Sequence, residues 1–98
     1  MTFDNLIFWP HKADMNYSIR SSVFLDKEKE IVLSVVAGPN FYCTGREKKM
    51  LNPTEKDFSS FEIAIIDESK EESEFDVRGW QSREDINNII KGYEKKEI

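Results

Sequence analysis

The C-terminal part of the chain carries its clearest helical period, which limits what the rest can fold into. Four apolar residues recur at intervals of three and four, on one stripe of a helix: Ile86, Ile89, Ile90 and Tyr93. Ser82 precedes the stripe as an N-cap, with Asp85 in the position of a capping box. The spacing predicts one amphipathic helix over residues 83–95. Its apolar stripe has to be buried against another layer.

The apolar runs before this helix have the length and composition of β-strands. Strands are predicted at residues 3–9, ended by Pro10, and at 21–26, 30–36, 58–66 and 75–78. Residues 30–36 are apolar on both faces, which predicts a central strand. The turn sequence Gly38-Pro39-Asn40 favours a further short strand at residues 41–44. Residues 45–56 read as a long polar loop.

These elements predict an α+β fold in one domain, residues 1–98. We expect an antiparallel sheet of four or five strands with the C-terminal helix packed on one face. The alternative is a sheet that curls into a partial barrel around the helix. Gly79 and Trp80 are expected to form the corner between the last strand and the helix. Trp80 either packs against the core there or is exposed as an anchor for a partner.

Negative charge is concentrated in one segment. The chain has a net charge of −5, and residues 67–76, DESKEESEFD, hold six acids and one base, which is also −5. We name residues 67–76 the acidic segment and expect it to be solvated and flexible. Its carboxylates are predicted to bind a protein partner with a basic surface: Asp67, Glu68, Glu71, Glu72, Glu74 and Asp76. The same charge argues against binding duplex nucleic acid, which needs clustered Lys and Arg.

The residues that most enzymes and metal sites require are scarce. Cys43 and His11 are the only residues of their types, so any cysteine–histidine nucleophilic pair would have to be this one. Zinc takes three or four ligands drawn largely from these two residue types, and the acidic segment lacks the glycine of a calcium loop. No phosphate-binding glycine motif is present. The sequence therefore predicts no catalytic residues, no metal and no cofactor. An enzyme with a pocket under the loop at 45–56 is the remaining alternative.

A second binding alternative comes from the segment NFYCTGREKK, residues 40–49. It places two aromatic residues beside three bases: Phe41, Tyr42, Arg46, Lys48 and Lys49. Stacking faces and cations are the features that hold single-stranded nucleic acid. A third alternative is mimicry of duplex DNA by the carboxylates of the acidic segment, although they are confined to one stretch.

The cellular compartment is predicted from two absences. One cysteine allows no intramolecular disulfide, and no apolar run approaches the roughly 18 residues of a membrane span. These observations predict a cytoplasmic protein without a membrane segment.

The order of parts in the C-terminal region also resembles a known group. It is similar to that of small proteins of unknown function encoded by bacteriophages and prophages. In those proteins a strand of the F-E-V-A kind is followed by a valine, a glycine–aromatic pair and a Ser/Thr-capped acidic helix start. The matching residues are Phe61, Glu62, Ile63, Ala64, Val77, Gly79, Trp80, Ser82, Glu84 and Asp85. The resemblance implies a mobile-element accessory protein, acting in the host cytoplasm, and supplies no catalytic residues. Together with the acidic segment it favours a non-catalytic protein binder, such as an inhibitor of a host defence nuclease.

Overall fold

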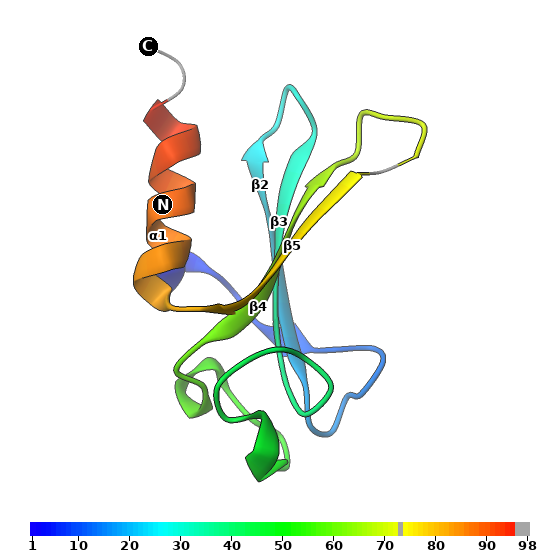
Figure 1. The fold of residues 1–98 in the computed structure, drawn as a ribbon, viewed down its shortest axis with the longest axis vertical. Helices are drawn as coiled ribbons and strands as arrows, with labels where there is room; N and C mark the ends of the chain where they lie inside the picture. The colour runs from blue at the N-terminus through cyan, green and yellow to red at the C-terminus, as the bar shows by residue number, and fades with distance from the viewer. Residues whose placement is uncertain (73, 96–98) are drawn as a thin grey trace.

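The computed structural model describes residues 1–72 and 74–95, which form an antiparallel sheet with one helix on one face (Figure 1). The strands are β1 Trp9–Pro10, β2 Ile19–Asp26, β3 Ile31–Ala37, β4 Phe61–Asp67 and β5 Glu74–Gln81. They lie side by side in chain order, so β3 is central, as its two apolar faces predict. The predicted α+β fold is confirmed. The partial barrel is not formed, because β1 and β5 remain the two edges of an open sheet.

The predicted helix is α1, Arg83–Glu94. Ser82 is its N-cap: the Ser82 hydroxyl accepts a hydrogen bond from the Asp85 backbone N–H at 3.0 Å, and the Asp85 carboxylate accepts one from the Ser82 N–H at 2.9 Å. These bonds hold the pKa of Asp85 below its usual value. Ile86 and Ile90 are buried under the sheet, so the apolar stripe of the sequence is the packed face of the helix.

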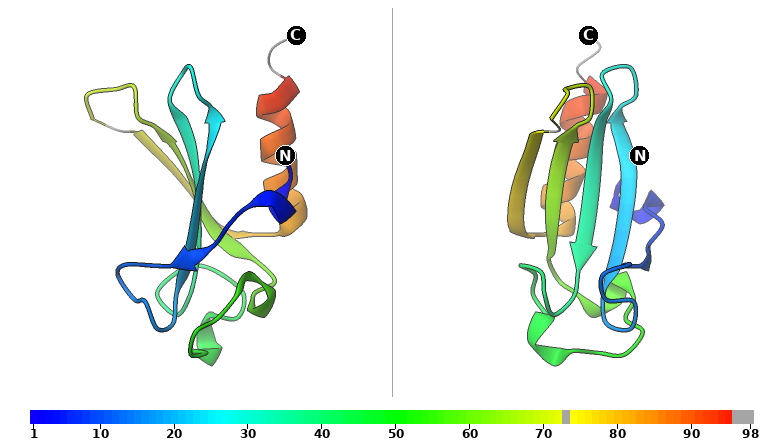
Figure 2. Two further views of the ribbon diagram at one scale, coloured as in Figure 1. Left: turned by 180° about the vertical axis from the view of Figure 1, so that it is seen from behind. Right: turned by 90° about the vertical axis from the view of Figure 1, so that its right-hand side faces the viewer.

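The core lies between α1 and one face of the sheet. Its strand residues include Ile19, Leu33, Val35, Ala37, Phe61 and Ile63. Phe61 is the aromatic centre, with ring centroids 5.0 Å from Phe3 and 5.9 Å from Phe8. The left view of Figure 2 shows α1 close to the sheet at its N-terminal end and diverging from it toward the hairpin tips. The helix therefore lies closest to the sheet at its first turns.

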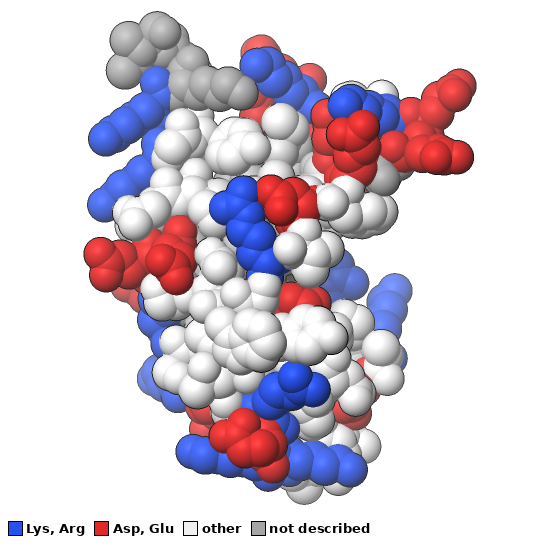
Figure 3. Space-filling model, in the orientation of Figure 1, with Lys and Arg blue, Asp and Glu red and all other residues white. Residues whose placement is uncertain are grey.

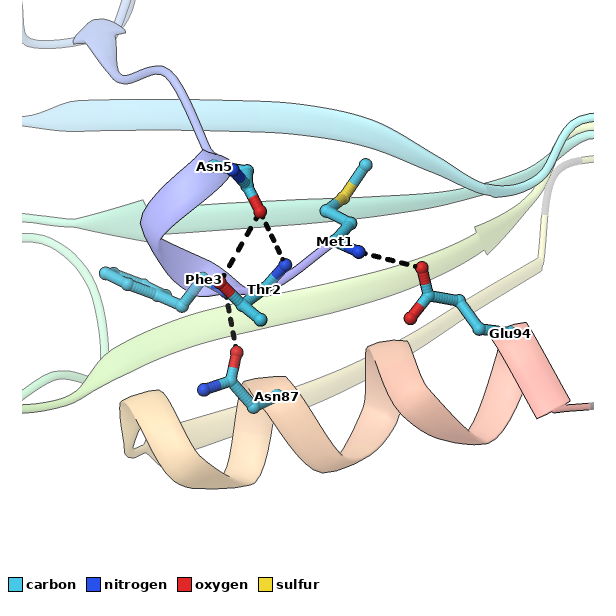
Figure 4. A network of polar contacts seen from close by, with 6 residues as sticks. All are labelled: Met1, Thr2, Phe3, Asn5, Asn87 and Glu94. Atoms are coloured by element: carbon cyan, nitrogen blue, oxygen red, sulfur yellow. Dashed lines mark hydrogen bonds and ion pairs between the residues drawn. The ribbon is translucent and has the colours of Figure 1, made fainter.

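The strand predicted at residues 3–9 is wrong. Phe3–Asn5 form a turn of 3₁₀ helix, and only Trp9 and Pro10 pair with β2. The Asn5 side chain accepts a hydrogen bond from the Thr2 N–H, and the Asn87 side chain of α1 accepts one from the Phe3 N–H at 2.6 Å (Figure 4). These side-chain acceptors replace strand partners, and Phe3 turns inward onto Phe61. Pro10, expected to end the strand, is itself part of the short β1 edge.

The strand predicted at residues 41–44 is also wrong, because side chains and the carbonyls of a local turn, rather than a neighbouring strand, accept hydrogen bonds from its backbone donors. The Tyr42 N–H donates to the Glu62 carboxylate at 3.0 Å, and the Thr44 N–H donates to the Ser60 hydroxyl at 2.8 Å. The polar loop that follows contains two short 3₁₀ turns, Arg46–Lys48 and Glu55–Asp57. None of the described helices is both long and apolar enough to cross a membrane.

Candidate functional site

The sheet has one covered face and one open face. On β3, Leu33 and Val35 belong to the core beneath α1. Val32, Ser34 and Val36 therefore point to the opposite side, because successive residues of a strand alternate between faces. We call that opposite side the open face. The helix lies wholly on the other side of the sheet (Figure 2).

Two rows of cross-strand neighbours run over the open face from β2 to β5. The first row is Phe24, Val32, Ile66 and Phe75, and the second is Ser22, Ser34, Ala64 and Val77. Phe24, Phe75 and Val77 leave 50%, 63% and 58% of their surfaces exposed. Opposed side chains in antiparallel strands lie close enough to touch. The first row is therefore a continuous apolar strip across four strands, exposed mainly at its two ends, Phe24 and Phe75, since Val32 between them is only 8% exposed. Val77 lies beside its β5 end.

An aromatic pair, Tyr42 and Trp80, lies at another part of the same face. Their ring centroids are 5.2 Å apart, and their side chains are 54% and 57% exposed. Tyr42 is held there because its N–H bonds to Glu62, which is in register with Val36 on the open face. The aromatic pair adds two large rings to the exposed apolar surface.

Trp80 is neither a corner nor a packed core residue, which corrects the first of the two predicted placements. Gly79 and Trp80 together oppose the single residue Glu62 of β4, so they form a β-bulge, and β5 continues to Gln81. Gly79 is required for space rather than for an unusual φ, since a Cβ there would lie 2.7 Å from the Tyr42 Cβ. Trp80 is the strained residue, with φ +52°. A bulky residue rarely adopts this left-handed conformation.

Substitutions at Trp80 should reveal this strain. We expect Trp80→Gly to be more stable than Trp80→Ala by about 1 kcal/mol, because alanine keeps the left-handed penalty and glycine does not. Urea denaturation of both variants measures the difference. Val77 is the control: it is exposed on the same strand without positive φ, so Val77→Gly should be less stable than Val77→Ala. If the glycine variant is less stable than the alanine variant at Trp80 as well as at Val77, the backbone of Trp80 is unstrained.

The predicted acidic residues all lie on the β4–β5 hairpin, but they divide into two groups. Glu68, Glu71 and Glu72 are exposed at the tip. The others are in the strands, in register with helix-side residues: Asp67 with Ile31, Asp76 with Ile65, and Glu74 with Asp67. Figure 3 shows acidic side chains gathered at the upper right, where Figure 1 places this hairpin.

Local contacts favour the charged form of two of these acids, Asp67 and Asp76. Hydrogen bonds from Ser69 lower the pKa of Asp67, and a hydrogen bond from Arg78 lowers the pKa of Asp76. Lys70 forms an exposed ion pair with Glu74 at 3.0 Å. With six acids and two bases, residues 67–78 still have a net charge of −4. The hairpin is therefore negatively charged at neutral pH.

The segment predicted to bind single-stranded nucleic acid does not form one platform. Phe41 packs against His11, with ring centroids 5.0 Å apart. Arg46 stacks over Tyr42 at 5.3 Å, whereas Lys49 lies over Tyr17, 5.1 Å from its ring centre. Lys48 lines a separate hollow of about 470 Å³, where it lies with the acids Glu47 and Asp57. The predicted aromatic and basic side chains thus have different neighbours.

The one cysteine and the one histidine have separate structural contacts. Cys43 is buried, its sulfur lies 3.4 Å from both the N and the O of Gly38, and burial raises the pKa of its thiol. The His11 Nδ1 accepts a hydrogen bond from the Ala13 N–H at 3.0 Å, and burial lowers the pKa of His11. Within residues 1–72 and 74–95, no three His, Cys, Asp or Glu side chains group as a metal site.

The open face was missed at the level of sequence, although β5 contains a signal for it. Residues 74–78, EFDVR, alternate charged and apolar side chains. This period of two places Phe75 and Val77 on one side of the sheet and the three charges on the other. The sequence does not specify which of those sides the helix covers.

Comparison with known proteins adds no further assignment. No protein-family model matches this chain, and neither the curated proteins nor the solved structures give a match. The residues on which the expected resemblance to phage-encoded proteins is based lie on β4, β5, the N-cap Ser82 and the first turn of α1, and these comparisons leave that resemblance an expectation.

Proposed function

We propose that this chain is a non-catalytic protein-binding module that docks through the open face onto a partner protein with a basic surface. The observation that carries this proposal is the apolar strip from Phe24 to Phe75, which α1 leaves uncovered. Burying apolar surface contributes roughly 25 cal/mol of favourable free energy per Å², and apolar surface that stays exposed does not make this contribution. Folded domains that retain a contiguous strip of this kind commonly use it for contact with another molecule.

The carboxylates of the acidic hairpin favour a partner with a basic surface. The β5 end of the apolar strip, at Phe75, lies within the same hairpin as Glu71 and Glu72. A partner that places an apolar patch on the strip therefore brings its neighbouring side chains beside these carboxylates. Complementary Lys or Arg residues there raise the association rate and select against acidic proteins.

Trp80 is the proposed anchor. Trp is enriched among the residues that dominate binding energy, and this one is exposed beside Tyr42. Its left-handed backbone conformation carries a stability cost of about 1–3 kcal/mol. Strained conformations cluster at functional sites, so strain of this size at an exposed residue supports a binding role for Trp80.

Single-stranded nucleic acid fits this surface less well. Bases stack on aromatic rings when a cationic groove follows the phosphates. On the open face Glu62 lies between Tyr42 and the sheet, and the adjacent hairpin has a net charge of −4 over residues 67–78. Phosphates approaching the aromatic rings would meet one cation, Arg46 over Tyr42, which is fewer than a cationic groove along several phosphates requires. Mimicry of duplex DNA would need acids spread more widely than one hairpin.

The proposal extends to a biological setting. A small acidic binder that resembles phage-encoded proteins suits an accessory protein of a mobile element, acting in the host cytoplasm. A host defence nuclease has the basic surface that such a binder requires, because nucleases bind phosphates. The buried Cys43, held as a protonated thiol, is compatible with a reducing compartment.

The test compares capture of partner proteins by the wild type and by an open-face variant, Phe24→Ser with Val77→Ser. Both side chains are exposed, so the variant is expected to fold. A partner that binds through the open face should lose at least about tenfold in affinity, or about 1.4 kcal/mol. The control is Leu51→Ser, which removes an equally exposed apolar side chain from a loop. Captured proteins are then purified and titrated against all three forms.

Salt dependence tests the electrostatic component. For the purified partner, Glu71→Gln with Glu72→Gln should weaken binding at low salt and flatten its dependence on salt concentration. Equal affinity of the open-face variant and the wild type would overturn the proposal. So would binding of labelled single-stranded oligonucleotides that is abolished by the same open-face variant, since the surface would then belong to nucleic acid.

A further inference from the structure

β5 is a free edge of the sheet. It pairs with β4 on one side, and no strand of residues 1–72 or 74–95 pairs with its other side. The right view of Figure 2 shows β5 as the outermost strand, with α1 behind the sheet rather than over this edge. Alternate residues of an edge strand direct their N–H and C=O groups away from the sheet, where another strand can pair with them.

The accessible part of this edge is residues 74–78. Beyond it, the chain's own groups bond to the backbone: the Trp80 N–H donates to the Tyr42 carbonyl at 2.9 Å, and the Gln81 side chain donates to the Gly79 carbonyl at 3.2 Å. The bulge at Gly79 and Trp80 also bends the strand away from a regular ladder. The edge therefore offers a flat stretch of five residues with a defined end.

The two sides of this stretch differ in chemistry. Phe75 and Val77 lie on the open face and are exposed. On the helix side, a groove of about 300 Å³ lies between β5 and α1, lined by Ile65, Asp76, Arg78, Asn88, Ile89, Gly92 and Tyr93. A neighbouring hollow of about 220 Å³ is lined by residues that include Ile31, Asp67 and Glu74. An added strand would thus meet the apolar Phe75 and Val77 on one side and, on the other, the carboxylates of Glu74 and Asp76 together with the guanidinium of Arg78.

We propose that an extended segment of the partner protein, with alternating basic and apolar residues, pairs with residues 74–78 as a sixth antiparallel strand. Cross-strand neighbours contact one another directly. Lys or Arg opposite Glu74 and Asp76 would be paired with carboxylates, and apolar residues opposite Phe75 and Val77 would extend the open face. This inference rests on the proposed protein-binding function and names the segment that the partner contributes.

A basic segment matches this edge better than a second copy of the chain does. A second β5 brings one cation, Arg78. It also brings two further carboxylates, Glu74 and Asp76. The net charge of −4 over residues 67–78 is left uncompensated by such a pairing and is compensated by a basic strand.

A capped synthetic peptide, acetyl-EVKFKT-amide, is the probe. In antiparallel pairing its glutamate faces Arg78, its two lysines face Asp76 and Glu74, and its valine and phenylalanine face Val77 and Phe75. We expect a Kd on the order of 0.1–1 mM, as for a short strand with few anchors. Two-dimensional ¹⁵N NMR titration of the protein should show the largest shifts, and slowed amide exchange, within residues 74–78.

N-methylated peptides isolate the backbone contribution. One peptide carries N-methyl groups on its valine and phenylalanine, and another carries them on its two lysines. Only one of these sets faces β5 in a paired strand. One peptide should therefore lose binding and the other should keep it. Equal binding by both would overturn the proposal, because pure electrostatic attraction does not distinguish the sets.

Substitutions of charged residues test whether the strand that pairs with residues 74–78 is basic. Glu74→Lys with Asp76→Lys should weaken peptide binding at least tenfold, whereas Asp4→Lys with Glu28→Lys, an equal change of net charge at exposed sites elsewhere, should not. The charge-reversed peptide acetyl-EVEFET-amide should not bind. Equal losses in both variants, or a wild-type dimer joined through β5, would overturn the proposal. If the peptide fails while capture still depends on Phe24 and Val77, only the edge pairing is refuted.

Discussion

Phe61→Ala should lower the free energy of unfolding by about 3–5 kcal/mol. Phe61 has 0% of its surface exposed and lies at the centre of the core. Its ring meets Phe3 at 5.0 Å and Phe58 at 6.3 Å, and the Arg83 guanidinium lies 5.2 Å from its centre. Removing it leaves a cavity where β4, the N-terminal turn and the start of α1 meet, and none of these can collapse without moving the others.

Urea denaturation followed by circular dichroism measures this loss. Phe24→Ala is the matched control, because it deletes the same atoms from an exposed position on the open face. The control should change the free energy of unfolding by no more than about 0.5 kcal/mol, as is usual at exposed sites. Similar losses for the two variants would contradict the assignment of covered and open faces on which the proposed docking surface depends.

Gly38→Ala should destabilise the fold by about 2–6 kcal/mol, the sum of backbone strain and overpacking at one position. Gly38 has φ +154°, and a Cβ there would lie 2.0 Å from the Ser18 hydroxyl oxygen and 2.7 Å from the Ser18 Cβ. Ser18 is itself fully buried, and its carbonyl accepts the His11 N–H. The backbone around Ser18 or Gly38 would have to move, since no flexible side-chain end is available to yield.

Gly92→Ala is the control for this second prediction. Gly92 is exposed on α1, with nothing within 4 Å of an added Cβ. Alanine there should stabilise the helix by about 0.5–1 kcal/mol. Thermal unfolding of both variants should therefore give shifts of opposite sign. A neutral Gly38→Ala variant would show that the turn after β3 adopts another conformation.

Elements with strong local patterns were predicted from the sequence. The stripe from Ile86 to Tyr93 and the cap at Ser82 are interactions within one helix, so their spacing gives α1 to within one residue of its observed end. The central place of β3 follows from its apolar residues on both faces. In both cases the signal is contained in the consecutive residues of one element, even though the partners of β3 lie on other strands.

The wrong predictions have a common origin in contacts between distant residues. Residues 3–9 have strand composition, yet Asn87 of α1 accepts the Phe3 N–H and Phe61 packs against its ring. Residues 41–44 have aromatic and β-branched side chains, yet Glu62 and Ser60 accept hydrogen bonds from two of their four backbone donors, those of Tyr42 and Thr44. Partners more than ten residues away determined these conformations. A local pattern contains no information about them.

The candidate site divides in the same way. The sequence by itself determined the charge of the acidic segment and the alternation along β5, because both are properties of consecutive residues. Only the tertiary structure decided that Phe24, Phe75 and Val77 lie on the face that α1 leaves uncovered, and that β5 is an edge. A single short helix can cover one side of a five-stranded sheet but not both. Which side it covers is set by packing across the whole core rather than by the pattern of any one strand.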